Sequence, residues 1–385
     1  MGPLSGIKVI EFEAIGPGPF CGMMLADMGA DVLVIDRAGG ADLGLNRERW
    51  YDTMMRGRRS VTLDMKSKDG AQAALELIGR ADALIEGLRP GVMERLGVGP
   101  DAALAKNPKL VYGRMTGWGQ SGPMAARAGH DINYIALAGP LSAIGRAGGL
   151  PPVPPLNLVG DFGGGGMLLA FGIAAGLVEA QRSGKGQVID AAMCEGASLL
   201  STMFHGMLAA KRWSEAPASN HLDTGAPWYD TYATQDGKYV SIGSIEARFY
   251  ADLLVRLGIA GEDLPKQHDR AGWPVLRARF TAAFQTKSRD EWCAVFEESD
   301  ACFAPVLNWS EAYAHPHNVA RGNFIDVGGV KQPAPAPRFS RTPGEVRRKP
   351  PERGEGGAAA LTDWGFDAAA VAKLRALGLG FASQG

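Results

Sequence analysis

Residues 7–35 read IKVIEFEAIGPGPFCGMMLADMGADVLVI, and this stretch decides the fold. Residues 7–12 predict a strand, and residues 20–28 predict a helix with Pro19 at a tolerated first position. Residues 32–35 are apolar throughout, as in a strand that is buried on both faces of a parallel sheet. A strand, a helix and a second strand in this order predict parallel strands joined by a right-handed crossover.

The same alternation continues through the first third of the chain. The pattern predicts helices at residues 69–79 and 101–106, and strands at residues 83–85 and 110–112. Repeated strand–helix units build a parallel sheet with helices on its faces. We therefore expect a Rossmann-like α/β sheet.

The later part of the chain predicts a second, smaller domain, because the pattern changes near Pro227 to the alternation of an antiparallel sheet. From residue 151 onward the expected elements are a glycine-rich helix at 161–182, a strand at 187–192, a long helix from about 195 to 211, an antiparallel sheet within 232–245, and helices at 247–257, 273–284 and 368–377. A length of 385 residues also favours two domains.

Composition and charge narrow the class of protein. Hydrophobic residues make up 46% and charged residues 21%, as in a globular protein with a packed core. The net charge of −1 gives no electrostatic case for nucleic acid or an anionic membrane as the main partner. Basic residues do cluster at Arg56, Arg58, Arg59, Lys66 and Lys68. This cluster fits either a small anionic ligand or a solvated surface patch.

Targeting signals and cysteines favour a soluble cytoplasmic protein. Glu11 and Glu13 interrupt the first apolar run, so no secretory signal is expected, and the C-terminus lacks a peroxisomal tripeptide. The apolar residues 167–178 are expected to be too few to cross a bilayer. The four cysteines lack metal-site spacing, and Cys194 and Cys302 lie in apolar segments, as buried free thiols do.

Residues 16–22, GPGPFCG, resemble a dinucleotide-binding fingerprint, because they follow a strand and open a helix, and Asp36 ends the next strand. The fingerprint works through backbone N–H groups that approach a pyrophosphate. Pro17 and Pro19 have no N–H group, and the third glycine is displaced by one position. We therefore do not expect nicotinamide binding.

Two segments carry candidate acid/base groups. In residues 129–134, GHDINY, His130 and Asp131 precede an apolar run, so they are expected at a helix start. Asp161 lies within residues 156–166, LNLVGDFGGGG, also at an expected helix start. Each carboxylate could be an ordinary helix cap. Glycines in a helix cost roughly 0.5–1 kcal/mol each, so these four indicate close approach of a ligand or of another helix. Close approach of a ligand and close approach of another helix both remain possible explanations of the four glycines, and the ligand is preferred.

The segments GHDINY and NLVGDFGGG, in this order, resemble the bacterial type of α-methylacyl-CoA racemase, which belongs to the family III CoA-transferase superfamily. The resemblance covers nearly the whole chain, since further matching segments lie at residues 16–19, 35–37, 58–66, 89–91, 116–120, 183–186, 299–302 and 335–340. The aspartate at position 161 is shared across the superfamily, whereas the histidine at position 130 points toward the racemases.

The resemblance implies a fold and an assembly. A large Rossmann-like CoA-binding domain would span residues 1–190 and the C-terminal return 331–385. A linker helix at 191–227, a small α+β domain at 228–310 and a second linker at 311–330 would complete the chain. Members form interlocked homodimers, with active sites between the large domain of one subunit and the small domain of the other. They use no metal or redox cofactor.

The resemblance also implies a mechanism. His130 and Asp161 would be the two acid/base groups on opposite faces of C2 of a 2-methylacyl-CoA, exchanging a proton through an enolate. His130 would serve the S form and Asp161 the R form, with Asp131 and Glu246 tuning His130. The positions that match the family's contacts with CoA and substrate are Arg37, Leu63, Asp64, Met65, Lys66, Arg95, Gly129, Ile132, Asn133, Tyr134 and Asn157.

Two alternatives to racemisation remain. The chain could transfer CoA between carboxylic acids with Asp161 as nucleophile, although such a transferase needs no second base at position 130. It could also bind CoA thioesters without catalysis. The acyl chain stays open between a branched fatty acid, a sterol side chain and a bile-acid intermediate, all within lipid metabolism.

Overall fold

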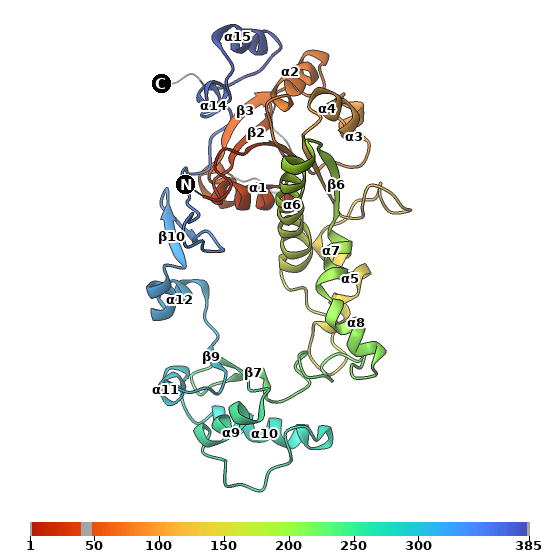
Figure 1. Cartoon of the computed structure of the whole chain (residues 1–385). Coiled ribbons are helices and arrows are strands. Elements are labelled where there is room, and N and C mark those ends of the chain that lie inside the picture. The colour runs from red at the N-terminus through yellow and green to blue at the C-terminus, as the bar shows by residue number, and fades with distance from the viewer. Residues whose placement is uncertain (1, 40–47, 383–385) are drawn as a thin grey trace. The chain divides into compact units, whose positions relative to one another are not determined.

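The computed structural model describes residues 2–39 and 48–382. The chain forms two compact units, and each is described by itself (Figure 1). Unit 1 comprises Met1–Ala138, Leu156–Ser201 and Gly322–Gly385, and unit 2 comprises Gly139–Pro155 and Thr202–Arg321. The domain boundaries expected from the sequence, together with the role of each domain, stay a prediction.

A parallel sheet of six strands forms the centre of unit 1, in the order β3-β2-β1-β4-β5-β6. The strands are β1 (Lys8–Phe12), β2 (Asp31–Arg37), β3 (Arg59–Leu63), β4 (Ala83–Glu86), β5 (Val111–Thr116) and β6 (Gln187–Ala192). This is the strand order of a doubly wound sheet, which confirms the expected Rossmann-like class. In such sheets ligands bind beyond the carboxyl ends of the strands, near the point where the order reverses. Here that point lies between β1 and β4.

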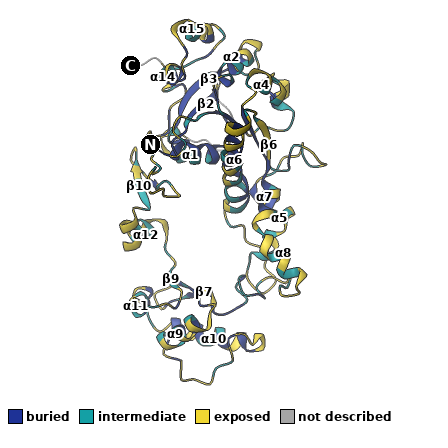
Figure 2. Ribbon diagram, viewed as in Figure 1, coloured by how far each residue is buried: buried dark blue, intermediate teal, exposed yellow. Residues whose placement is uncertain are grey.

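Helices cover both faces of this sheet, and Figure 2 shows β2 and β3 as buried, whereas the edge strand β6 is largely exposed. Leu77, Ala103 and Leu361 belong to the core on one face, whereas Leu25 and Ile173 belong to the core on the other. The α-helices of unit 1 are α1 (Pro17–Asp27), α2 (Lys68–Ile78), α3 (Val92–Arg95), α4 (Pro100–Lys106), α5 (Asp131–Ala138), α6 (Leu168–Ser183), α7 (Met193–Leu200), α14 (Gly357–Asp363) and α15 (Ala368–Ala376). Short 3-10 turns lie at η1 (Arg49–Tyr51) and η2 (Thr53–Met55), and β10 (Phe324–Val327) pairs with β11 (Val330–Pro333).

Two expected helices differ from the structure. The glycine-rich helix begins earlier than expected, as a π-helix, η4 (Leu158–Met167), that continues into α6. The long helix expected from residue 195 is interrupted at Ser201, between α7 and α8 (Thr202–Ala209). The Ser201 hydroxyl donates to the carbonyl oxygens of Ala197 at 3.2 Å and Ser198 at 2.8 Å. Such side-chain bonds compete with the helical backbone pattern.

The run Leu158–Ser183 is 26 residues long, and among the residues described it alone is long and apolar enough to cross a membrane. Its most apolar window has a mean hydropathy of 1.5 and is 39% buried. The expectation that this segment is too short was wrong, because the π-helix and α6 join into one run. α6 packs against β5 and β6, as a core helix of a soluble α/β protein does.

The C-terminal segment returns to unit 1 along β3. The Ser60 N–H donates to the Glu355 carbonyl at 2.9 Å, and Thr62 and Gly380 exchange two backbone hydrogen bonds at 2.7 and 2.8 Å. Trp364 is buried in the core of the sheet. Residues more than 290 positions apart in sequence therefore share one edge of the sheet.

Unit 2 holds an antiparallel sheet with the order β7-β8-β9, as the alternating pattern predicted. Its strands are β7 (Tyr229–Ala233), β8 (Tyr239–Gly243) and β9 (Phe303–Pro305). Its remaining helices are η3 (Pro140–Ala143), α9 (Ala247–Arg256), η5 (Arg270–Gly272), α10 (Trp273–Phe284), α11 (Arg289–Val295), α12 (Trp309–Ala314) and α13 (Pro316–Arg321). Aromatic side chains dominate its core, including Trp228, Phe280 and Trp292.

Three members of the basic cluster are internal. Arg56 pairs with Asp27 at 2.6 Å, and Arg58 pairs with Glu11 at 2.9 Å. Arg59 pairs with Asp31 and Asp363. All three arginines are buried. They therefore can neither bind a small anionic ligand nor form a solvated surface patch, and both expectations were wrong for them. The partners lie far away in sequence and therefore could not be read from the local pattern.

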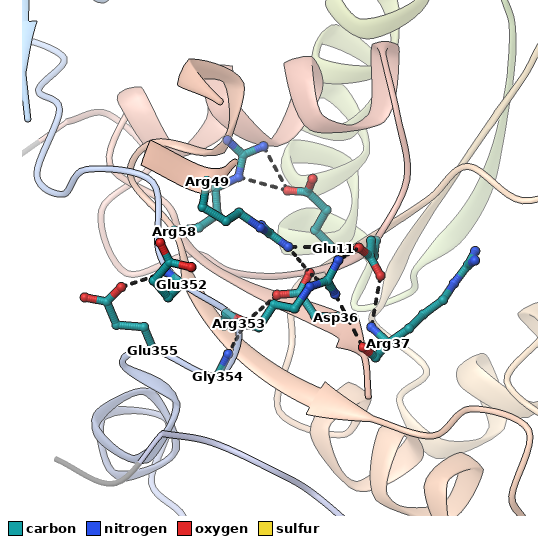
Figure 3. A network of polar contacts seen from close by, with 11 residues as sticks. Glu11, Asp36, Arg37, Arg49, Arg58, Glu352, Arg353, Gly354 and Glu355 are labelled. Carbon is teal, nitrogen blue, oxygen red and sulfur yellow. Dashed lines mark hydrogen bonds and ion pairs between the residues drawn. The ribbon is translucent and has the colours of Figure 1, made fainter. Parts of the chain in front are cut away.

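The buried carboxylate of Asp36 is already occupied by protein groups (Figure 3). It accepts hydrogen bonds from Arg49 and from the Ser60 hydroxyl, both at 2.5 Å. Arg353 lies 3.6 Å from the same carboxylate and 2.5 Å from Glu13. Asp36 therefore joins β2 to Ser60 of β3 and to Arg49 inside unit 1.

The Arg58–Glu11 pair yields a stability prediction. Arg58→Met leaves a buried carboxylate without its cation and should lower the free energy of unfolding by about 3–5 kcal/mol. Burial already raises the pKa of Glu11, and loss of the opposing Arg58 charge raises it further. The folded variant then binds this proton more tightly than the unfolded chain does, so the loss should be larger at pH 8 than at pH 5.

Urea denaturation at the two pH values measures this effect. Lys106→Met is the matched control, because it removes a pair with Glu76 at 2.9 Å that is partly exposed to solvent. That change should cost less than about 1 kcal/mol. A loss for Arg58→Met no larger than the control's would show that the buried pair does not stabilise unit 1.

Candidate active site

His130 lies directly before the first residue of α5, as the sequence predicted. Its backbone N–H donates to Asn133 Oδ1 at 3.0 Å, and the Asn133 N–H donates back to the His130 carbonyl at 2.8 Å. The first of these bonds is one half of a capping box, and the pair fixes the chain where it enters the helix. The His130 side chain is exposed, so its imidazole remains accessible at the N-terminal end of α5.

Asp131 connects the start of α5 to the π-helix η4. Its Oδ2 atom accepts the backbone N–H groups of Gly160 at 2.6 Å and Asp161 at 2.7 Å. The Asp131 side chain is buried, and its Oδ1 atom has no hydrogen-bond partner among the described residues. The carboxylate therefore positions the backbone that carries Asp161. Its expected tuning of His130 stays a prediction.

Asp161 lies in the first turn of η4, and its side chain is partly buried. The Asn157 side-chain amide donates to Asp161 Oδ2 at 3.1 Å. Asn157, expected only as a substrate contact, thus lies against a candidate acid/base group. The spacing of four residues between the two positions is the sequence signal for this contact in a helical segment.

Burial raises the pKa of the Asp161 carboxyl above its ordinary value. The hydrogen bond from Asn157 and the charge of His130 oppose the shift, whereas the negative charge of Asp131 adds to it. Asp161 is therefore biased toward its protonated form, which suits a general acid.

The glycines of η4 allow other helices to approach closely. A methyl group at Gly164 would lie 2.7 Å from the Ala197 nitrogen of α7. Methyl groups at Gly165 and Gly166 would lie within 3.0 Å of side chains or backbone of Pro17 and Phe20 in α1. All three glycines are buried. The preferred explanation of a ligand was wrong for these positions, because α1 and α7 occupy the space.

An aromatic pair frames the segment before α5. Trp118 and Tyr134 meet edge to face, with ring centroids 4.8 Å apart, and the Tyr134 hydroxyl donates to the Gly129 carbonyl. Burial, followed by the charge of Asp161, raises the pKa of Tyr134 to about 12. Sequence reasoning did not single out Trp118 as part of the site. Its place directly beyond β5, at the carboxyl end of a central strand, was the available signal.

The candidate CoA contacts follow the carboxyl ends of two neighbouring strands. Arg37 ends β2 and Lys66 follows β3, and both side chains are exposed. Arg95, at the end of α3, is also exposed. Leu63 is fully buried in the core, so only its backbone can meet a ligand. Asp64 is exposed, Met65 and Gly129 are partly exposed, and both Ile132 and Asn133 are exposed on α5.

Glu246 lies in unit 2, where it is the residue before α9. Its side chain is exposed and makes no capping hydrogen bond. A carboxylate that is free of local partners is available to another group. Its expected role beside His130 stays a prediction.

The cysteines are free thiols, and Cys21 is buried. Cys302 is exposed, so the expectation of a buried thiol there was wrong. It directly precedes β9 and has a φ angle of 53°. Within residues 2–39 and 48–382, no group of three or more His, Cys, Asp or Glu side chains is placed to hold a metal ion.

Comparison with curated proteins identifies close relatives. The alpha-methylacyl-CoA racemase of Mus musculus is 44% identical over 373 residues, and that of Homo sapiens is 42% identical over 379 residues. Each alignment covers 96% of this chain and 96% of the relative. The acetyl-CoA:oxalate CoA-transferase of Acetobacter aceti is 30% identical and covers 86% of this chain and 88% of that protein.

A solved structure shares the fold. The crystal structure of a CAIB/BAIF family protein from Brucella suis has a TM-score of 0.81 at 27% identity, covering 94% of this chain and 99% of that one. Residues 4–356 match the family described as CoA-transferase family III. The resemblance seen in the GHDINY and NLVGDFGGG segments is thereby confirmed. The match spans most of the sequence, and the chain belongs to CoA-transferase family III.

Proposed function

We propose that this protein is a racemase that interconverts the two C2 epimers of a 2-methylacyl-CoA thioester. The observation that carries the proposal is the connection between the two acid/base candidates: Asp131, the neighbour of His130, accepts the backbone N–H groups of Gly160 and Asp161. The proposal is supported by relatives named alpha-methylacyl-CoA racemase that match nearly the whole chain at 42–44% identity.

Racemisation needs one acid/base group on each face of C2. In one direction His130 removes the C2 proton, and protonated Asp161 returns a proton to the opposite face. In the other direction ionised Asp161 removes the proton, and His130 returns one. Burial of Asp161 favours the protonated form that the first direction requires. Asp131 and Asn157 hold the Asp161 segment and its carboxyl in place.

The intermediate is an enolate, whose negative oxygen needs donors that are positioned in advance. Backbone N–H groups in the first turn of α5 supply these donors, and the helix dipole adds to their effect. The same turn is fixed by the Asn133 contacts and by the buried Asp131 side chain. Because this turn is already fixed, its N–H groups need little rearrangement when negative charge develops on the enolate oxygen.

CoA transfer is the second candidate function, because a CoA-transferase of Acetobacter aceti is also similar to this chain. In that reaction Asp161 would attack the thioester as a carboxylate. Such a transferase needs no second acid/base group, so the exposed His130 at the start of α5 would have no task. This residue and the 42–44% identity to relatives named alpha-methylacyl-CoA racemase favour racemisation over transfer, and over CoA binding without catalysis.

The CoA portion of the substrate is proposed to lie across the carboxyl ends of β2 and β3. Arg37 and Lys66 offer exposed cations there for phosphate groups, and Arg95 offers another at the end of α3, which follows β4. Gly129, Ile132, Asn133 and Tyr134 would line the thioester end of the site. The acyl chain of the substrate is left unassigned among a branched fatty acid, a sterol side chain and a bile-acid intermediate.

We also propose that the enzyme acts in the cytoplasm as a homodimer, without a metal or redox cofactor. The outward face of the run Leu158–Ser183 is apolar, with Met167 50%, Phe171 71% and Val178 56% exposed. Such a face costs free energy in water, and a second subunit would cover it. By family resemblance, Glu246 would then reach His130 from the small domain of the partner subunit.

Incubation with an enantiopure 2-methylacyl-CoA in deuterated water tests the proposed reaction. Deuterium should enter at C2 while the optical signal decays toward a near-equal mixture, because each inversion returns a proton from the enzyme. Mass spectrometry and chiral chromatography of the thioester measure the two changes. A free carboxylic acid is added in a parallel sample as a CoA acceptor. If CoA moves to this acid while C2 keeps its original hydrogen, the protein is a transferase.

The environment of Asp161 yields a prediction of opposite pKa shifts. Asp131→Asn keeps an acceptor for the two N–H groups but removes a negative charge, so it should lower the pKa of Asp161. Asn157→Ala removes a hydrogen bond that favours the ionised form, so it should raise that pKa. Carbon NMR titration of ¹³C-aspartate-labelled protein, assigned with Asp161→Asn, measures both. Shifts in the same direction would contradict the described contacts.

A further inference from the structure

Gly16 lies beside the Asp161 carboxyl without being one of the expected site residues. It follows β1 and is the N-cap residue of α1, with φ 67° and ψ −115°. A Cβ atom at this position would lie 3.1 Å from Asp161 Oδ2 and 3.6 Å from Asp161 Cγ. The bare backbone of Gly16 is therefore one wall of the space that the carboxyl occupies.

Two independent constraints exclude a side chain at position 16. The residue precedes Pro17, which disfavours the helical region, and its φ and ψ are the mirror image of an extended conformation. Glycine adopts this conformation freely, whereas L residues are strained in it. Separately, contact at 3.1 Å is tighter than ordinary packing, so an added methyl group would move the carboxyl by a few tenths of an ångström.

The carboxyl has little freedom to yield. Its Oδ2 atom, the one that an added Cβ at position 16 would meet, accepts a hydrogen bond from the Asn157 amide at 3.1 Å. The backbone of Asp161 is held by Asp131. A methyl group at position 16 would therefore push Oδ2 relative to Asn157, and the orientation of the whole carboxyl would change.

We propose that Gly16 is a positioning residue for Asp161, and that its missing side chain fixes the carboxyl in the orientation that exchanges a proton with one face of C2. The inference rests on the proposed racemase function. In the step concerned, the Asp161 hydroxyl proton moves to C2 of the enolate. The enolate electron pair forms the new C–H bond, the thioester carbonyl is restored, and Asp161 is left as a carboxylate.

Gly16→Ala tests this role through deuterium uptake at C2 from each pure enantiomer. Uptake from the enantiomer that Asp161 serves should fall about tenfold relative to uptake from the enantiomer that His130 serves, because misplacement by 1 Å can cost about 10²-fold. A merely destabilised enzyme would lose both rates together. Gly184→Ala is the control, since Gly184 has φ 75° and no atom within 4 Å of an added Cβ. It should leave the ratio of the two rates unchanged.

A double-mutant cycle on stability tests the contact without any substrate. Gly16→Ala should lower the urea midpoint less in an Asp161→Ala background than in the wild type, because the methyl group then has no carboxyl to meet. Backbone strain at position 16 acts equally in both backgrounds, so it cancels in the cycle and only the contact with the carboxyl remains. Additive effects of the two changes would overturn the proposal.

The outcomes separate the inference from the function on which it rests. A wild-type protein that exchanges neither enantiomer would refute racemisation, while the stability cycle still reports on the contact. A wild type that exchanges both enantiomers, with equal losses for both in Gly16→Ala, would refute the role of Gly16 alone.

Discussion

Two hydrogen bonds to one buried carboxylate set the geometry of the candidate active site. Asp131 Oδ2 accepts the backbone N–H groups of Gly160 and Asp161, and Asp131 is the chain neighbour of His130. A single side chain thereby connects the turn that carries the histidine to the turn that carries the aspartate. The same carboxylate also adds to the rise in the pKa of Asp161. Asp131 thus positions the proposed acid and adds to the effect that burial has on its pKa.

The π-helix η4 makes this connection possible. Three of its buried glycines let α1 and α7 come to distances that a side chain would forbid. Short π-helical segments are uncommon and are frequent at functional sites. Their cost is offset here by close packing on two sides and by the Asp131 contacts. The glycine-rich stretch therefore allows close helix packing, and this packing holds the segment that carries Asp161. We propose that the missing side chain of Gly16 positions the Asp161 carboxyl itself.

Local pattern predicted the parallel sheet and the helix start at His130, because buried strands and cap residues leave short-range signals. The π-helix could not be predicted, since a run of glycines has no side-chain periodicity. The ion pairs of Arg56, Arg58 and Arg59 join residues distant in sequence, so the basic cluster was misread. The two acid/base candidates came from motifs and from resemblance. The contact between Asn157 and Asp161 needed coordinates, because a spacing of four does not say which pair meets.

The proposed mechanism requires His130 and Asp161 to serve opposite faces of C2. Deuterium uptake at C2 from each pure enantiomer, measured for folded His130→Ala and Asp161→Ala proteins, tests it most directly. Neither variant should interconvert the enantiomers, because inversion needs both groups. Each variant should still exchange one enantiomer without inversion, and the two variants should retain opposite ones. A His130→Ala protein that interconverts the enantiomers at near the wild-type rate would contradict the account and remove His130 from the mechanism.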